Sequence, residues 1–202
     1  RGLNRSFPGS SKGSLASQMA RIFMKEVVLK STHGIDFHTG AIHRYNIPQI
    51  RALLENPKTK HMARAFGASV VLNSSLRDGS LREAVQKKNI PILLFEGGEA
   101  LRFDESVIKM GVKGCFNVME SIGMLAKKKN KKKPEVVIAK DSYWVRSTHG
   151  GSLSVLRKAG DRVSKGEVLG IVQDLFGRVQ IEIKADEPGI IIGRRRLPLI
   201  NN

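Results

Sequence analysis

The spacing of apolar residues divides this chain of 202 residues into two unlike halves. Over residues 14–125, segments with apolar residues at helical spacing alternate with short, uniformly apolar runs. Such alternation is typical of an α/β domain with a largely parallel sheet. After residue 134, apolar residues alternate with polar ones and glycines interrupt them at intervals, which indicates an all-β module.

The pattern also predicts individual elements in the first half. Ser14 and Ser80 are expected to cap helices, because a serine side chain accepts hydrogen bonds from the first helical turn. In α/β sheets, ligands bind beyond the C-terminal ends of the strands, so charged residues at strand ends are the first candidates for function. Helices are expected over residues 14–29, 47–67, 79–89 and 106–125, and strands over residues 69–73 and 90–98.

Asp36 and His38 stand two residues apart where an apolar run arrives at Ile35. Two residues apart on a strand means that both side chains lie on the same face. A carboxylate beside an imidazole suits a functional site, whereas Asp36 followed by Thr39 and Gly40 also suits an ordinary turn. The spacing alone leaves both interpretations open.

The net charge of +17 raises the possibility of a nucleic-acid-binding protein. The run KKKNKKK at residues 127–133 contributes six lysines, about a third of this charge, and such a run is commonly a solvated linker. Aromatic residues make up only 5% of the chain, which does not favour a base-stacking surface. We therefore predict a domain over residues 1–126, a lysine-rich linker over 127–134 and a β-rich domain over 135–202, with nucleic acid disfavoured as a partner.

The cysteine content and the hydropathy pattern address the location of the protein. The single cysteine, Cys115, excludes an internal disulfide and suits a reducing compartment, so we expect a cytoplasmic protein. No uninterrupted apolar stretch approaches the ~20 residues that a membrane span needs. The sequence does not decide between a monomer and a homo-oligomer.

Four motifs, in this order, give the chain a family resemblance. Together they resemble the succinylglutamate desuccinylase/aspartoacylase family of zinc-dependent N-acyl amino acid amidohydrolases, whose fold is related to that of the zinc carboxypeptidases. The resemblance implies part of a zinc carboxypeptidase-like domain, followed by a small β-domain of barrel-sandwich or lipoyl-like type. The motifs are LNRSFPG (3–9), IDFHTG (35–40), NIPQIR (46–51) and LLFEGG (93–98).

The resemblance assigns roles to single residues. His38 matches the third ligand of a catalytic Zn²⁺, and Asp36 beside it fits either an orienting group or a strand-end cap. Glu96 matches the catalytic glutamate, which takes a proton from water and passes it to the leaving amine. Asn4 and Arg5 match a pair that binds a substrate carboxylate, which suits the planar fork of an arginine.

Two further charged residues have competing interpretations. Arg82 fits either a further contact to the substrate carboxylate or a solvated helix residue, with the solvated one slightly favoured. Glu99 is the substitute for Glu96 as catalytic base, but it is expected to lie past the end of the strand.

One part of the family pattern is absent. The family's other two zinc ligands come from a His-x-x-Glu segment ahead of the Asn-Arg pair, and no such segment occurs in the 202 residues. By the resemblance, we expect roughly a hundred further residues before Arg1, among them these two ligands.

The resulting prediction is a zinc-dependent hydrolase of linear amide bonds that removes an acyl group from a small N-acyl amino acid. The alternatives are a non-catalytic relative and a basic nucleic-acid-binding protein. A lipoyl or biotin carrier is disfavoured, because the stretch QDLFGRVQ at residues 173–180 lacks the lysine that such a carrier modifies.

Overall fold

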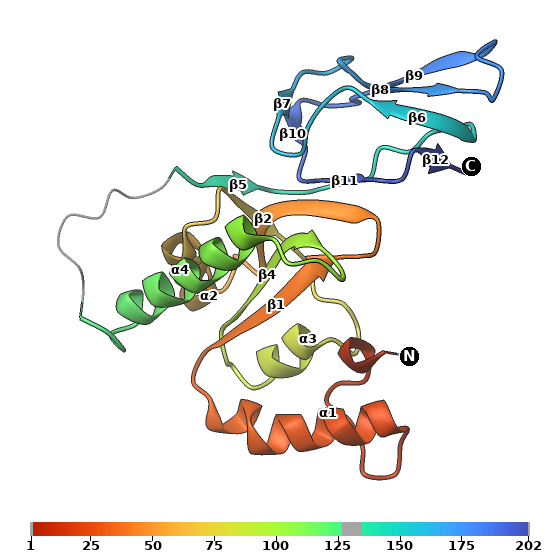
Figure 1. Cartoon of the computed structure of the whole chain (residues 1–202). Helices are drawn as coiled ribbons and strands as arrows, with labels where there is room; N and C mark the ends of the chain where they lie inside the picture. The colour runs from red at the N-terminus through yellow and green to blue at the C-terminus, as the bar shows by residue number, and fades with distance from the viewer. Residues whose placement is uncertain (1, 127–134, 202) are drawn as a thin grey trace. The chain divides into compact units, whose positions relative to one another are not determined.

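The computed structural model describes residues 2–126 and 135–201 (Figure 1). The chain folds into two compact units, and each is assembled from segments that are separated in the sequence. The first unit takes its described residues from Arg1–His38, Ile50–Phe95 and Lys109–Asp141, and the second consists of Thr39–Gln49, Glu96–Ile108 and Ser142–Asn202.

The helices agree largely with the predicted ones. The side chain of Ser14 accepts a hydrogen bond from the Ser17 N–H, and that of Ser80 accepts one from the Glu83 N–H, so both predicted caps are confirmed. No helix of the described residues is both long enough and apolar enough to cross a membrane. The helical elements are η1 (Leu3–Arg5), α1 (Leu15–Glu26), η2 (Val28–Lys30), α2 (Pro57–Phe66), α3 (Leu81–Gln86) and α4 (Glu105–Ser121).

The predicted helix over 47–67 is wrong in its first part. Residues 47–52 belong to a strand, and the helix begins only at Pro57, with Asn56 as its cap. The strand is buried on both faces around Gln49 and Ile50, so polar and apolar residues do not alternate along it. Its sequence therefore lacks the periodicity that identifies a half-exposed strand.

The strands of the first half continue from one unit into the other. β1 (Gly34–Gly40), β2 (Arg44–Ala52) and β4 (Ile92–Glu99) each have residues in both units, whereas β3 (Val70–Asn73) lies in the first. The strand order is β1-β4-β2-β3-β5, where β5 is Val137–Ala139. β3 and β5 are parallel and β11 pairs with β2 in the antiparallel direction, so the sheet is mixed.

The region after residue 141 consists of short strands within the second unit. β12, β6, β8 and β9 form an antiparallel sheet in this order, β10 pairs with β7, and β11 pairs with β2. The barrel-sandwich or lipoyl-like character of this region stays a prediction. The strands are β6 (Gly151–Val155), β7 (Arg162–Val163), β8 (Val168–Gln173), β9 (Gln180–Lys184), β10 (Gly189–Ile190), β11 (Gly193–Arg195) and β12 (Leu199–Ile200).

The boundaries of the units differ from the predicted division at residues 127–134. Residues 137–139 belong to the first unit, because β5 hydrogen-bonds to β3 as a parallel edge strand. Residues 39–49 and 96–108 belong to the second unit together with the C-terminal strands. The predicted lysine-rich linker itself lies outside the described residues.

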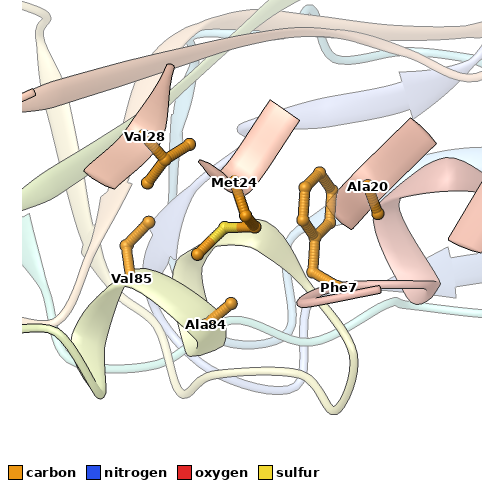
Figure 2. Close-up of a cluster of buried hydrophobic side chains, with 6 residues drawn as sticks. All are labelled: Phe7, Ala20, Met24, Val28, Ala84 and Val85. Atoms are coloured by element: carbon orange, nitrogen blue, oxygen red, sulfur yellow. The ribbon is translucent and has the colours of Figure 1, made fainter. Parts of the chain in front are cut away.

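A hydrophobic cluster in the first unit joins the N-terminal segment to two helices. Figure 2 shows its side chains pointing toward one another between α1 and α3. Burial of this apolar surface fixes the segment after η1 against both helices, which places Asn4 and Arg5. The cluster consists of Phe7, Ala20, Met24, Val28, Ala84 and Val85.

Candidate active site

Asn4 is anchored by contacts with the start of α3. The Leu81 N–H donates a hydrogen bond to Asn4 Oδ1 at 3.0 Å, and the Phe7 N–H donates to the Gly79 carbonyl at 3.0 Å. Phe7 itself is buried in the hydrophobic cluster. The Asn4 side chain is therefore held by the start of α3, the nearby Phe7 backbone is held by Gly79, and Asn4 Nδ2 is directed toward His38 in β1.

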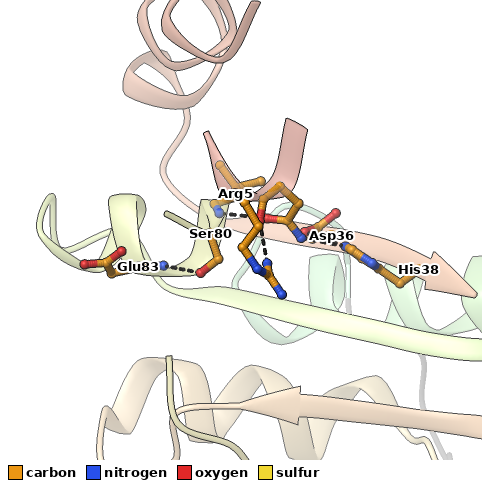
Figure 3. A network of polar contacts seen from close by, with 7 residues as sticks. Arg5, Asp36, His38, Ser80 and Glu83 are labelled. Atoms are coloured by element: carbon orange, nitrogen blue, oxygen red, sulfur yellow. Dashed lines mark hydrogen bonds and ion pairs between the residues drawn. The ribbon is translucent and has the colours of Figure 1, made fainter. Parts of the chain in front are cut away.

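Arg5 lies beside Asn4 but is exposed at the surface of its unit. Its guanidinium donates a hydrogen bond to the Asn4 carbonyl, and Figure 3 shows it next to the chain of polar contacts at Asp36 and His38. An exposed guanidinium keeps the donors that a substrate carboxylate requires.

Asp36 and His38 form a hydrogen-bonded pair within β1, so the turn interpretation of this stretch is wrong. Residues 34–40 are all in the strand, and Asp36 Oδ2 lies 3.0 Å from His38 Nε2 (Figure 3). Asn4 Nδ2 lies 3.4 Å from the same ring nitrogen. Three residues that the sequence singled out in two separate motifs thus meet at one imidazole.

The partner of His38 indicates which ring nitrogen carries the proton. A carboxylate only accepts hydrogen bonds, so in a neutral ring the Nε2–H donates to Asp36 and the lone pair is on Nδ1. Asn4 Nδ2 is itself a donor, so it lies beside this N–H without donating to it. A carboxylate in this position is a usual support for a metal-binding histidine, because it fixes the tautomer and the ring orientation. Asp36 is therefore an orienting group for His38 rather than a strand-end cap.

The described residues include one candidate ligand for a zinc ion. Among them no group of three histidine, cysteine, aspartate or glutamate side chains is close enough to hold a metal ion. A catalytic zinc needs three protein ligands and an open position. His38 with its Asp36 partner has the chemistry of one of these ligands, and the other two have no counterpart in the described part of the chain.

Arg82 is buried, which corrects the favoured interpretation of a solvated helix residue. Its side chain is 6% exposed, and its guanidinium donates to the carbonyls of Ser74 and Ser75 at 3.4 and 3.3 Å. These bonds tie α3 to the segment that follows β3. A contact between Arg82 and the substrate stays a prediction.

Glu96 lies in the second unit, where β4 continues beyond Phe95. Its Oε1 accepts a hydrogen bond of 2.7 Å from Nδ2 of Asn46, which is buried in β2. The next residue is Gly97, where a Cβ atom would lie 3.2 Å from Pro48 Cα and 2.9 Å from Val107 Cγ1. The glycine after Glu96 therefore allows this close approach of β4 to β2.

Glu99 is part of β4 rather than past its end, and its carboxylate has structural partners. Glu99 is 5% exposed; Oε1 accepts a hydrogen bond from the His43 N–H at 3.0 Å. Its Oε2 lies 3.3 Å from Arg196 Nε and 3.7 Å from Arg102 Nε. The side chain thus connects β4, the loop before β2 and the residue after β11, and these partners do not suit a catalytic base.

Replacing Glu99 by glutamine is expected to lower the free energy of unfolding by about 1–3 kcal/mol, because a buried charge-assisted contact to Arg196 is lost. Urea unfolding of the variant and the wild type measures this change. Glu187→Gln is the matched control: Glu187 pairs with Lys165 at an exposed position, and its replacement is expected to change nothing measurable. Equal stability of the wild type and Glu99→Gln would contradict the structural role.

The structure brings some of the predicted residues together, and the predicted residues belong to two different units. Asn4, Asp36 and His38 form one cluster in the first unit, with Arg5 beside it. Glu96 belongs to the second unit together with Asn46, a residue for which no role was predicted. The only signal for Asn46 was its place at the start of the NIPQIR motif.

Comparison with known proteins shows the fold class and the family of this chain. The chain has an α/β fold with a mixed sheet that is shared with solved deacylase-family structures. Residues 1–122, more than half of the chain, match the succinylglutamate desuccinylase/aspartoacylase catalytic domain. The protein therefore belongs to the succinylglutamate desuccinylase/aspartoacylase family, as the four motifs predicted.

A curated relative is the N-alpha-acetyl-L-2,4-diaminobutyric acid deacetylase of Halomonas elongata, which is 26% identical over 96% of this chain. The apo structure of the ectoine utilization protein EutE (DoeB) from Ruegeria pomeroyi superimposes with a TM-score of 0.87 at 24% identity, over 98% of this chain. A succinylglutamate desuccinylase from a Silicibacter species gives 0.84 at 23% identity, also over 98% of this chain.

The chain is shorter than these relatives. It spans 60% of the Halomonas deacetylase, 66% of the Ruegeria protein and 64% of the Silicibacter protein.

Proposed function

We propose that the protein is a zinc-dependent amidohydrolase that removes the acyl group from an N-acyl amino acid. Family membership makes a deacylase the expected class, and the cluster of Asn4, Asp36 and His38 is the observation that supports it most directly. The name of the Halomonas relative suggests acetylated diamino acids as the first substrates to test.

His38 would hold the zinc through Nδ1, while Asp36 fixes the ring through Nε2. The other two ligands would come from a His-x-x-Glu segment outside the 202 residues. When bound, zinc would supply a Lewis acid that polarises the acyl carbonyl and acidifies the attacking water.

Glu96 would act as the proton carrier. Its carboxylate would take a proton from the attacking water and then deliver it to the nitrogen of the leaving amino acid. The hydrogen bond from Asn46 occupies Oε1 and so limits rotation of the carboxylate, which suits a group that must transfer a proton in a fixed direction.

Asn4 and Arg5 would hold the carboxylate of the substrate. The exposed guanidinium of Arg5 offers a planar fork, and Asn4 Nδ2 offers a neutral donor beside His38. Because Asn4 contacts both the α3 start and the imidazole, a carboxylate bound to the pair would be fixed relative to His38.

The proposal is tested by hydrolysis of a panel of N-acetyl and N-succinyl amino acids, with Nα-acetyl-L-2,4-diaminobutyrate among them, by the full-length protein. We expect release of free amino acid from at least one member of the panel. Absence of turnover on every member, with zinc present, would instead support a non-catalytic relative.

Arg5→Ala is expected to lower kcat/KM on the best substrate by about 10–100-fold, because a charge-assisted contact to the substrate is lost. Steady-state kinetics of the variant measures this loss. Arg21→Ala, which replaces an exposed arginine on α1, is the control and should behave like the wild type. An unchanged kcat/KM in Arg5→Ala would remove Arg5 from the substrate site.

A further inference from the structure

Asn46 is a buried residue whose side chain donates a hydrogen bond to Glu96. It is 6% exposed in β2, and its Nδ2 donates the 2.7 Å hydrogen bond to Glu96 Oε1. Burying an amide without hydrogen-bond partners costs free energy, so the orientation of the Asn46 amide depends on its bond to the Glu96 carboxylate. Asn46 and Glu96 both belong to the second unit.

The other side of the Asn46 amide faces β11. Gly193 is the register partner of Asn46 in the β2–β11 pair, and the Ile47 N–H donates to the Ile192 carbonyl at 3.0 Å. A Cβ atom at position 193 would lie 2.2 Å from Asn46 Oδ1, which is far inside van der Waals contact. Only a residue without a side chain leaves room for the amide here.

The end of β11 is fastened independently of Asn46. Arg196, the residue after the strand, forms the ion pair with buried Glu99 at 3.3 Å, and its guanidinium stacks over the Tyr45 ring at 4.8 Å. The Arg196 N–H also donates to the His43 carbonyl at 2.8 Å. These contacts keep Gly193 in register with Asn46.

We propose that Asn46 is a positioning residue for Glu96, and that Gly193 of β11 fixes the Asn46 amide in the orientation that donates to the Glu96 carboxylate. The inference rests on the proposed function, in which Glu96 carries the proton. It gives the C-terminal β-strands an indirect part in the reaction, because Gly193 holds the amide that orients Glu96.

Two alanine variants of glycines in the C-terminal strands test the proposal. Gly193→Ala places a methyl group against Asn46 Oδ1, whereas Gly189→Ala in β10 meets nothing within 4 Å. Gly193→Ala is expected to lower kcat by about 10–100-fold, the size of a lost hydrogen bond to a charged group, with KM and zinc content unchanged. Gly189→Ala is expected to match the wild type.

Asn46 variants show whether the effect of Gly193→Ala passes through this amide. Asn46→Asp keeps the size of the side chain but removes the donor, so its kcat is expected to fall by a similar factor. The double variant Asn46→Asp/Gly193→Ala is expected to be no slower than Asn46→Asp alone, because both changes break the same contact. Fully multiplicative losses would overturn the proposal.

A measurement that needs no activity separates this proposal from the proposed function. The side-chain amide resonances of Asn46, assigned by their loss in Asn46→Asp, should shift in Gly193→Ala and in Glu96→Gln but not in Gly189→Ala. If no substrate is hydrolysed but these shifts occur, the proposed function fails and the positioning geometry stands. If Gly193→Ala leaves both the resonances and kcat as in Gly189→Ala, the positioning role is overturned, whatever the substrate.

Discussion

Replacing Glu96 by glutamine is expected to lower kcat by about 10²–10⁴-fold with zinc still bound. Glutamine keeps the size of the side chain and can still meet Asn46, but it cannot take a proton from water. Steady-state hydrolysis of the best substrate in the panel, with the zinc content of each preparation measured, gives the ratio. KM is expected to stay near that of the wild type, because Glu96 does not hold the substrate carboxylate.

Glu99→Gln is the matched control for Glu96→Gln. It removes the same charge from the same strand three residues further on, where the carboxylate serves Arg196 and the His43 N–H. We expect a loss of stability with kcat reduced much less than in Glu96→Gln. Near-wild-type turnover of Glu96→Gln would show that Glu96 is not the proton carrier.

Replacing His38 by alanine is expected to remove most of the bound zinc from the full-length protein, because three protein ligands become two. Metal analysis after dialysis against a weak chelator measures the remaining zinc. His61→Ala is the control: His61 is exposed on α2 and contacts the Ser121 carbonyl, so its replacement should leave the zinc content unchanged. A full complement of zinc in His38→Ala would contradict the assignment of His38 as a ligand.

The elements with clear periodicity or a capping serine could be predicted from the sequence. Ser14 and Ser80 mark true helix starts, and the apolar run from residue 90 is β4. β2 was not predicted because both of its faces are buried around Gln49 and Ile50 and Pro48 lies within it, so neither alternation nor ordinary strand composition identifies it.

The division of the chain could not be predicted, because it depends on strand pairing between distant segments. The lysine run suggested a boundary, yet Val137–Ala139 pairs with β3 and Gly193–Arg195 pairs with β2. A change of composition marks where a chain leaves one pattern, but hydrogen bonds between strands decide which unit a segment joins. The same limit applies to the place of residues 39–49 in the second unit.

Motifs identified the candidate site better than the environment of single charged residues did. The pairing of Asp36 with His38 follows from strand geometry, and their contact with Asn4 depends on how η1 packs near β1. The burial of Arg82 was not predicted because an isolated charge is expected to be solvated. Glu99 was expected past the strand because the predicted strand ended at residue 98, whereas β4 includes it. Arg82 contacts backbone carbonyls, which no sequence pattern reveals. Glu99 has Arg102 nearby in the sequence, but its shorter contact is with Arg196, which lies far along the chain.

The most direct test of a zinc-dependent deacylase is a zinc titration of the metal-free, full-length protein with hydrolysis of Nα-acetyl-L-2,4-diaminobutyrate, or the best substrate of the panel, as the readout. We expect no turnover without metal and a linear rise in turnover that ends at about one equivalent of zinc per chain, as a single three-ligand site requires. Full turnover of the metal-free protein, unchanged by added zinc, would contradict the proposed function.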